Sequence, residues 1–420
     1  METQEAEKKE TLNRRSFLGA AAAALSAGAF LAPFAAAQSK EEIRKGTLNH
    51  SADNPGPVNK VLQGENISSE VPPITDKGDL STFWYSFDLA HRRIQDGGWT
   101  RQVTEKDLPS SRDIAGVNMR LTAGSYRELH WHTANEWAYM LYGNARITCL
   151  NPDGTIFIDD VSEGDLWYFP AGFPHSIQGL GPDGCEFLLV FDEGGFSEYQ
   201  TFLISDWVAH TPAEILEKNF HLGETAIHKL PEDEEYIFPG TVPGSLEDDK
   251  RAVGGKAVES KISYSFRMKA MKPNFENEGG SARIVDSSVF LAAKAIAAVL
   301  VTIKPGGMRE LHWHPNASEW QYWIKGSGRM TVFASSGNAR TMNFNANDVG
   351  FVPAVAGHYI ENTGTEDIVF LEMFKSSYFS DFSLNQWIRR LPQQIASEHL
   401  HLNNGELRQI PDKKEPTIAR

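Results

Sequence analysis

One pattern of candidate metal ligands occurs twice in this chain, 182 positions apart, and this duplication constrains the fold more than any other feature. Each copy contains a His-Trp-His triplet, then a glutamate and then a third histidine. The two sets are His130, His132, Glu136 and His175, and His312, His314, Glu319 and His358. A single His-x-His pair is weak evidence for a metal site. Two matching sets at one internal spacing predict two metal sites on a repeated scaffold.

The repeat extends well beyond the candidate ligands. Arg-Glu-Leu-His-Trp-His begins at Arg127 and again at Arg309, and the matches continue through Pro170 and Pro353 to Phe191 and Phe374. A period of this length is too long for a solenoid and has the size of a whole domain. The chain of 420 residues is therefore predicted to hold two copies of one domain.

The spacing of the ligands indicates how each site is built. Residues i and i+2 of a strand point to the same face, so both histidines of each triplet can hold one ion while Trp131 or Trp313 faces away. Arg127 and Arg309 lie three residues before the first histidine, which places them on the opposite face of a regular strand. We therefore expect a bend that brings each arginine inward to bind a carboxylate; the alternative is a surface ion pair.

Local patterns predict an antiparallel β-structure. Residues 145–150, 166–169 and 186–191 are short β-like runs separated by Gly, Pro and Asp-Gly turns, which is typical of a sandwich or barrel. A helix is expected at 213–219, with Thr211 as its cap and Pro212 at its first position, and in the matching segment 385–396.

The ligand types narrow the chemistry of both sites. Three imidazoles and one carboxylate, without thiolates, disfavour a structural zinc site. Such a set suits Mn, Fe, Ni, Cu or Zn, and the spacing does not choose among them. Four protein ligands around an octahedral ion leave two positions open for a small ligand. A pair of purely structural metal sites is the alternative.

Residues 1–37 are predicted to be a targeting segment. Arg14-Arg15 directly precedes an apolar, alanine-rich stretch that ends in the small residues 35–37. We interpret this as a twin-arginine export signal, in preference to a general secretory signal or a retained anchor, so the mature protein is expected in the periplasm or secreted. No later stretch is long and apolar enough for stable membrane insertion.

The net charge of −15 also constrains the partners. The targeting segment carries four acidic and four basic side chains, so the acidity belongs to the rest of the chain. This argues against nucleic acid or an anionic membrane as a partner. The chain has two cysteines, Cys149 and Cys185, in apolar β-like runs. Buried free thiols are the favoured interpretation, and one disulfide is the alternative.

Two motifs give the chain a resemblance to a known family. Gly-x5-His-x-His-x3/4-Glu-x6-Gly is met by residues 124–143 and 306–326. Gly-x5-Pro-x-Gly-x2-His-x3-Asn is met by 164–175, but Gly179 departs from its Asn. The second copy keeps Asn362, but Asn347 and Val355 replace both glycines. These are the cupin motifs. Arg-Glu-Leu-His-Trp-His in both halves, Gly-Asp-Leu-Trp-Tyr-Phe-Pro and Pro-His-Ser-Ile-Gln make the chain similar to the bicupin oxalate decarboxylases, from about residue 80 to 400.

The resemblance implies an all-β fold of two tandem cupin β-barrels (double-stranded β-helix or jelly roll) with short flanking helices. The expected organisation follows the repeat. It comprises the signal peptide 1–37, an N-terminal arm 38–80, cupin domain 1 at 81–235, a linker 236–260, cupin domain 2 at 261–405 and a C-terminal tail 406–420.

The resemblance further implies manganese in each barrel, dioxygen as co-catalyst and oxalate as substrate, cleaved to formate and carbon dioxide. It places a proton-donating acid at Glu198 on a mobile lid and a second catalytic carboxylate at Glu372, where the first barrel has Leu189. Arg127 and Arg309 would bind the substrate. The plainer alternatives are a solvated loop charge for Glu198 and a buried ion-pair partner for Glu372.

The lid departs from the family pattern. Residues 197–201 read Ser-Glu-Tyr-Gln-Thr, whereas the family has Asn or Asp and then Ser after the glutamate. An oxalate oxidase that produces carbon dioxide and hydrogen peroxide therefore stays open as an alternative, as does a non-enzymatic metal-binding bicupin. The resemblance also implies a homo-oligomer, either a trimer or a hexamer.

Overall fold

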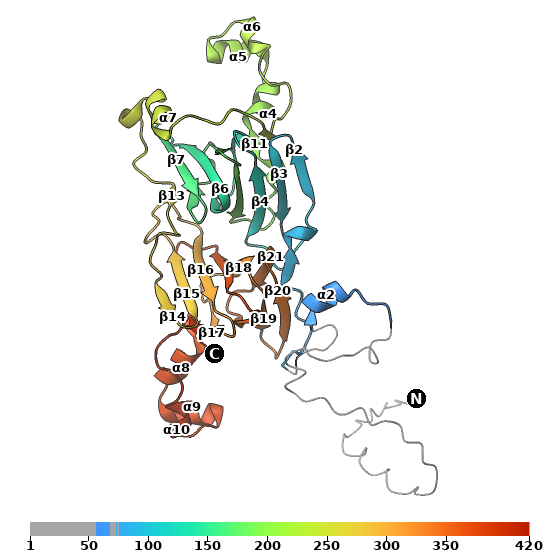
Figure 1. Ribbon diagram of the computed structural model, residues 1–420, viewed down its shortest axis with the longest axis vertical. Coiled ribbons are helices and arrows are strands. Elements are labelled where there is room, and N and C mark those ends of the chain that lie inside the picture. Colours follow the sequence, from blue (N-terminus) through green and yellow to red (C-terminus); the bar gives the residue numbers. More distant parts are fainter. Residues whose placement is uncertain (1–55, 68–72, 74, 420) are drawn as a thin grey trace, which may run out of the picture. The chain divides into compact units, whose positions relative to one another are not determined.

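The computed structural model describes residues 56–67, 73 and 75–419. The predicted signal peptide and most of the predicted arm lie outside these residues. The described part of the chain forms two β-barrels, one blue to green and one orange to red in Figure 1. The predicted all-β architecture with short helices is confirmed. No helix in the described ranges is long and apolar enough to cross a membrane.

The first barrel is formed by a sheet of twelve strands, in the order β11-β5-β9-β6-β10-β4-β3-β2 with β7, β8, β12 and β13 paired alongside. Every pairing between two of these strands is antiparallel. The strands are β2 (Arg92–Gln95), β3 (Gly98–Val103), β4 (Ala115–Leu121), β5 (Tyr126–Trp131), β6 (Glu136–Leu150), β7 (Ile156–Ser162), β8 (Leu166–Phe169), β9 (His175–Gly179), β10 (Cys185–Phe191), β11 (Phe202–Leu203), β12 (Ile237–Phe238) and β13 (Ser265–Phe266).

The second barrel consists of a seven-stranded sheet, β1-β21-β18-β23-β16-β15-β14, and a six-stranded sheet, β20-β19-β22-β17-β24 with β25 beside β17. The strands are β1 (Trp84–Ser86), β14 (Phe275–Asn277), β15 (Gly280–Val285), β16 (Ala297–Ile303), β17 (Met308–Trp313), β18 (Glu319–Lys325), β19 (Gly328–Phe333), β20 (Ala339–Phe344), β21 (Asp348–Val352), β22 (Gly357–Asn362), β23 (Ile368–Phe374), β24 (Phe382–Ser383) and β25 (Thr417–Ile418).

The two halves exchange short strands. β1 precedes the first barrel in sequence but pairs with β21 of the second, and β13 follows the first barrel but pairs with its β8. One apolar core runs through both barrels and includes the fully buried Trp137 and Trp320. A Cβ atom added to Gly116 of β4 would lie 2.5 Å from the Trp320 ring, so the barrels pack too closely there for any side chain at residue 116.

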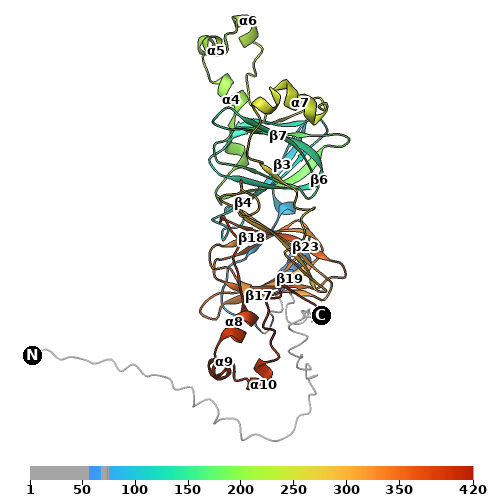
Figure 2. The same ribbon diagram turned by 90° about the vertical axis from the view of Figure 1, so that its left-hand side faces the viewer.

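Figure 2 shows the α-helices that follow each barrel outside the strands. In the described residues, short helices lie before, between and after the barrels. They are α2 (Lys60–Glu65), η1 (Phe87–Leu89), η2 (Glu198–Gln200), α4 (Ile204–Ala209), α5 (Ala213–Phe220), α6 (Glu224–Ile227), α7 (Leu246–Ala252), η3 (Gly255–Ala257), α8 (Leu384–Arg390), α9 (Gln393–Leu400) and α10 (Asn404–Leu407), where η marks a 3-10 helix.

Two details of the helix predictions were wrong. The helix at 213 does form, but Pro212 is its N-cap, and the Thr211 hydroxyl donates to the Trp207 carbonyl of the preceding helix instead of capping. The segment 385–396 is not one helix, because α8 ends at Arg390 and α9 begins after Pro392. A proline there cannot continue the hydrogen-bond pattern of the helix before it.

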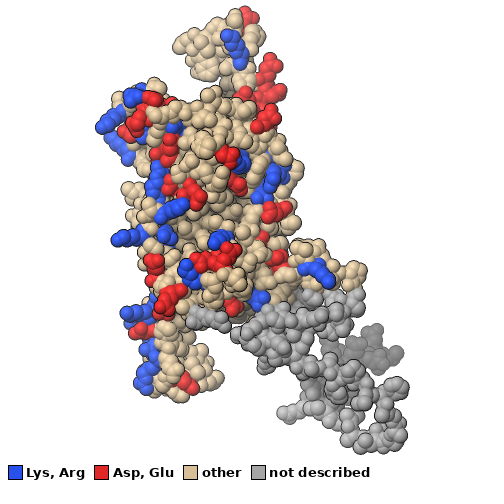
Figure 3. Space-filling model, viewed as in Figure 1, with Lys and Arg blue, Asp and Glu red and all other residues tan. Residues whose placement is uncertain are grey.

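Both cysteines are free thiols in the first barrel, as favoured from the sequence. Burial raises the pKa of Cys149 and that of Cys185 to about 12, so both stay protonated at ordinary pH. On the surface, Figure 3 shows acidic and basic side chains interspersed over the barrels. Some of these side chains form ion pairs between the two halves of the chain, as Lys269 does with Glu163 at 3.1 Å.

Candidate metal centres

Each predicted ligand set converges in the interior of its own barrel. Within a set the candidate ligand atoms all lie within 4.8 Å of one another, and all eight residues are buried. In the first barrel β5, β6 and β9 carry the ligands, except for His132, which directly follows β5. In the second barrel β17, β18 and β22 do so, with His314 directly after β17. The sequence spacing therefore brings together the residues that it predicted.

The expected bend is present in both triplet strands. The pairing of β5 with β9 shifts register between Arg127 and His130, and that of β17 with β22 shifts between Arg309 and His312. Such an irregularity lets two residues with odd spacing face the same side. Both arginines are consequently buried, which excludes the alternative of a surface ion pair. Trp131, which lies between the two ligand histidines of the triplet, points outward and stacks on Phe202, with ring centroids 5.6 Å apart.

Backbone carbonyls fix the orientation of every imidazole. Each ligand histidine donates its Nδ1 hydrogen to a main-chain oxygen. Its Nε2 lone pair is therefore free and directed at the centre of the cluster. The acceptors are the carbonyls of Glu128, Ala134 and Phe173 in the first barrel, each at 2.7 Å, and those of Glu310, Ser380 and Ala356 in the second, at 2.7, 2.9 and 3.1 Å. The rings are thus held in the tautomer that binds a metal.

The carboxylates are held among these rings. In the first barrel Glu136 Oε2 lies 3.2 Å from His132 Nε2, while Trp167 donates its indole N–H to Glu136 Oε1 at 2.9 Å. Burial opposes ionisation of Glu136, but the neighbouring rings of His132 and His175 lower its pKa to about 2. In the second barrel Glu319 Oε2 lies 2.8 Å from His314 Nε2 and 2.9 Å from His358 Nε2.

The donor set fits a divalent metal ion in both barrels. Burial lowers the pKa of His130, His175 and His312, so these imidazoles are neutral and can offer lone pairs. His312 Nε2 is buried without a hydrogen-bond partner among the described residues, which is costly unless a cation accepts its lone pair. Three nitrogens and one carboxylate suit manganese among other first-row metals.

A second pair of charges lies beside the first cluster. Arg127 Nε donates to Glu198 Oε1 at 2.7 Å, and both side chains are almost completely buried. The backbone N–H of Glu198 donates to Gln102 Oε1 at 3.0 Å, which holds the loop against β3. Burial raises the pKa of Glu198, although the Arg127 charge opposes this. Glu198 is therefore not a solvated loop charge.

In the second barrel Arg309 Nε donates to Glu372 Oε1 at 3.2 Å. Burial raises the pKa of Glu372 to about 7, again against the opposing charge of the arginine. Glu372 lies on β23 and is part of a buried ion pair, which was its plainer interpretation. Leu189 occupies the corresponding position on β10, so the two halves differ as the sequence indicated.

Three residues that surround these arginines were missed from the sequence. Thr201 contacts Arg127, Asp381 contacts Arg309, and Lys414 contacts Asp381. The residue-by-residue match of the repeat ends at Phe374, because the loop after it is three residues shorter than its counterpart (375–381 against 192–201). A renewed alignment on Pro231 and Pro411 would have revealed the corresponding segments.

Comparisons with known proteins agree with this geometry. A family model described as Cupin matches residues 86–228 and 266–407. The chain is 50% identical over 364 residues to oxalate decarboxylase OxdC of Bacillus subtilis (strain 168), covering 87% of this chain and 94% of that protein. It is 38% identical over 384 residues to a probable oxalate decarboxylase of Arthroderma benhamiae, covering 90% and 91%. A solved structure of the Bacillus subtilis enzyme, studied for its Mn(II) centres, matches with a TM-score of 0.84 and 50% identity over 87% of this chain and 96% of that one.

Proposed function

Because this chain belongs to the bicupin oxalate decarboxylases of the cupin family, we propose that it cleaves oxalate to formate and carbon dioxide, with one manganese ion in each barrel and dioxygen as co-catalyst. The activity is that of a carboxy-lyase. One C–C bond of hydrogen oxalate breaks and one C–H bond forms, so the products are no more oxidised overall than the substrate. Manganese supplies the one-electron chemistry when it is bound.

The observation that carries this proposal is the buried pair of Arg127 and Glu198 beside the first ligand set. The guanidinium can bind and polarise one carboxylate of the substrate. Loss of carbon dioxide leaves a one-carbon fragment that needs a proton at carbon. The Glu198 carboxyl, kept protonated to higher pH by burial, is placed to supply that proton. Because both side chains are buried, this proton transfer would take place away from bulk water.

The altered lid motivates the closest rival. If the proton does not arrive, dioxygen can take up the electrons, and oxalate, dioxygen and two protons become two carbon dioxide and one hydrogen peroxide. The test is to measure oxalate consumption with formate and peroxide quantified together. We expect about one formate for each oxalate and little peroxide. Peroxide in equal amount to oxalate would establish the oxidase instead, and no consumption would leave a non-enzymatic bicupin.

We further propose that the protein is exported by the twin-arginine pathway to the periplasm or beyond. The support is the Arg14-Arg15 pair before the apolar stretch that ends at Ala37. This pathway carries folded proteins, so the metal can be loaded before export. Replacing both arginines by lysine should retain the precursor in the cytoplasm. Delivery of that double variant to the periplasm would instead indicate the general secretory route.

Finally, we propose that the mature protein is a homo-oligomer, either a trimer or a hexamer. The support is the apolar surface of the helices after each barrel, where Trp207 and Trp387 are more than half exposed. Contiguous exposed apolar surface marks protein contacts in soluble proteins. Light scattering on the purified protein should give three or six times the mass of one chain, and a monomeric mass would contradict the proposal.

A further inference from the structure

The two buried arginines differ in how many of their nitrogen atoms remain available. In the first barrel Arg127 Nε donates to Glu198 and Nη2 donates to Thr201 Oγ1 at 2.8 Å. Arg127 Nη1 has no hydrogen-bond partner among the described residues, although it is fully buried. A buried donor without an acceptor indicates a place for a ligand oxygen.

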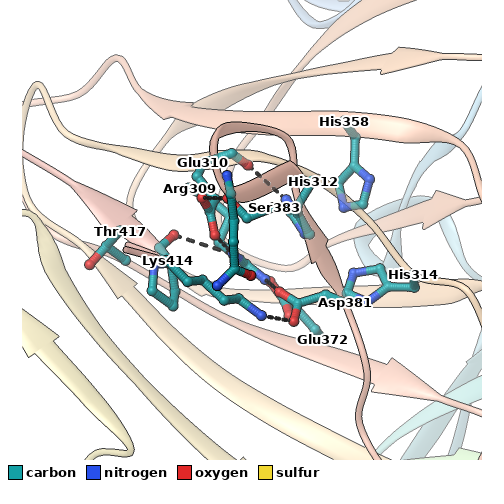
Figure 4. A network of polar contacts seen from close by, with 12 residues as sticks. Arg309, Glu310, His312, His314, His358, Glu372, Asp381, Ser383, Lys414 and Thr417 are labelled. Atoms are coloured by element: carbon teal, nitrogen blue, oxygen red, sulfur yellow. Dashed lines mark hydrogen bonds and ion pairs between the residues drawn. The ribbon is translucent and has the colours of Figure 1, made fainter. Parts of the chain in front are cut away.

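In the second barrel all three nitrogens of the arginine are engaged. Arg309 Nε donates to Glu372 at 3.2 Å, Nη2 to Asp381 Oδ2 at 3.0 Å and Nη1 to the Pro416 carbonyl at 3.4 Å. Figure 4 shows Glu372 and Asp381 at Arg309, with the Asp381 carboxylate beside His314. The two carboxylates occupy the donors that an incoming carboxylate would need.

Strand pairing identifies Asp381 as the counterpart of Thr201. β11 pairs Phe202 with the tryptophan of the first triplet, and β24 pairs Phe382 with that of the second. Thr201 and Asp381 each directly precede these strands. A neutral hydroxyl in the first barrel is therefore replaced by a negative carboxylate in the second, at the same place beside the same arginine.

The carboxylates of the second barrel are also less free to move. Glu198 lies on the 3-10 turn η2 in the ten-residue loop 192–201, outside the paired strands of the barrel. Glu372 lies within β23, and Asp381 adjoins β24 in the seven-residue loop 375–381. The backbone of Glu372 is therefore fixed by strand pairing, and that of Asp381 by the start of β24 and by a shorter loop.

A lysine from the C-terminal segment holds Asp381 in place. Lys414 contacts the Asp381 carboxylate, which is 2% exposed, and the segment continues into β25 beside Arg309. The corresponding segment before β12 carries Glu234, which pairs instead with Arg93. The Lys414 charge offsets that of Asp381, so the net charge beside the arginine is similar in the two barrels. The barrels differ in the number of arginine N–H donors that remain for a ligand.

We propose that Asp381, held by Lys414, prevents a dicarboxylate from binding in the second barrel, so that a chain with two metal centres binds a single oxalate. Asp381 thereby determines specificity between the two sites. To bind at Arg309, oxalate would have to displace a buried carboxylate that is already paired with Arg309 and Lys414. The inference rests on the proposed function, because oxalate is the ligand in question.

The test is the stoichiometry of oxalate binding to the full-length mature protein loaded with manganese, measured by calorimetry without dioxygen so that no turnover occurs. Wild type should bind one oxalate per chain. Asp381→Thr should bind two, and the reciprocal Thr201→Asp should bind none. Metal content and melting temperature of each variant confirm that both centres are intact.

A matched variant assigns the sites. His130→Ala removes a ligand of the first centre and should abolish oxalate binding, whereas His130→Ala with Asp381→Thr should restore one oxalate per chain. Two oxalates on wild type would overturn the inference and leave the proposed function standing. No oxalate on wild type would contradict the proposed function itself. If Asp381→Thr does not fold, the wild-type and Thr201→Asp stoichiometries still decide the matter.

Discussion

The Nε2 atoms of His130 and His175 lie 3.1 Å apart in the first barrel, although both imidazoles have already used their Nδ1 hydrogens on backbone carbonyls. Neither ring can donate to the other. Two lone pairs directed at each other are unfavourable in a buried site unless a cation lies between them. The fold is thus arranged for a metal ion before the ion binds.

The first prediction concerns metal content and stability. Protein produced with ample manganese should contain two ions per chain, measured by elemental analysis, and His130→Ala should contain one. Each ion that binds only the folded state stabilises it by about 2.7 kcal/mol when its free concentration is 100 times its dissociation constant. A chelator should therefore lower the melting temperature. An unchanged metal content in His130→Ala would contradict the two-site structure.

The sequence predicted most of the metal centres because their geometry is local. Two histidines at i and i+2 on one strand have a fixed relation, and the repeat supplied the same relation twice. The inward arginines were also predictable, since their odd spacing required the irregularity that the structure shows between Arg127 and His130. The roles assigned to Glu198 and Glu372 came from the resemblance and stay predictions.

The contacts that distinguish the two barrels were not predictable in the same way. Asp381 and Lys414 are 33 residues apart and meet only because β24 and β25 both pair with β17. The exchange of β1 and β13 between the halves is equally non-local. An alignment of the two halves pairs the segments that contain these residues, but it does not show that Lys414 meets Asp381 or that the strands are exchanged, because tertiary packing decides both.

The second prediction concerns backbone strain at Val355. Its φ is +61°, in the left-handed region that a β-branched residue avoids, and the corresponding Gly172 has φ +77°. The two residues correspond because the N–H of each donates to the carbonyl of a ligand histidine, His314 and His132. Val355→Gly should raise the free energy of unfolding by about 0.5–1 kcal/mol. This gain is the left-handed strain that the substitution relieves, minus the extra conformational entropy that glycine loses on folding. Denaturant titration measures this change.

The reverse substitution is the control. Gly172→Val should destabilise the protein, and no heavy atom lies within 4 Å of the added Cβ, so the effect is conformational and not steric. Val355 is largely exposed, so its loss removes little packing. A lower stability of Val355→Gly would show that the side chain makes contacts that outweigh the strain.

The third prediction concerns pH. Burial raises the pKa of Glu198 above its ordinary 4.5, and the carboxyl must be protonated to act as an acid. Formate production should be constant well below the raised pKa and fall as pH rises through it, by about tenfold per pH unit beyond. Initial rates at saturating oxalate from acid to neutral pH test this. A flat profile would remove Glu198 as the essential acid.

The last prediction concerns the fate of the one-carbon fragment after carbon dioxide has left. Glu198→Gln keeps the size and hydrogen-bonding capacity of the side chain beside Arg127 but has no acidic proton to give. Formate production should fall by about 100-fold or more, while manganese and oxalate still bind.

Glu372→Gln is the matched control in the second barrel, where the same change is made beside Arg309. If only the first barrel turns over, this variant should keep its formate production, while Glu198→Gln yields more peroxide for each oxalate consumed because dioxygen takes the electrons instead. Formate, peroxide and bound metal are measured on both variants under identical conditions. Wild-type formate production by Glu198→Gln, together with its loss in Glu372→Gln, would place the chemistry in the second barrel.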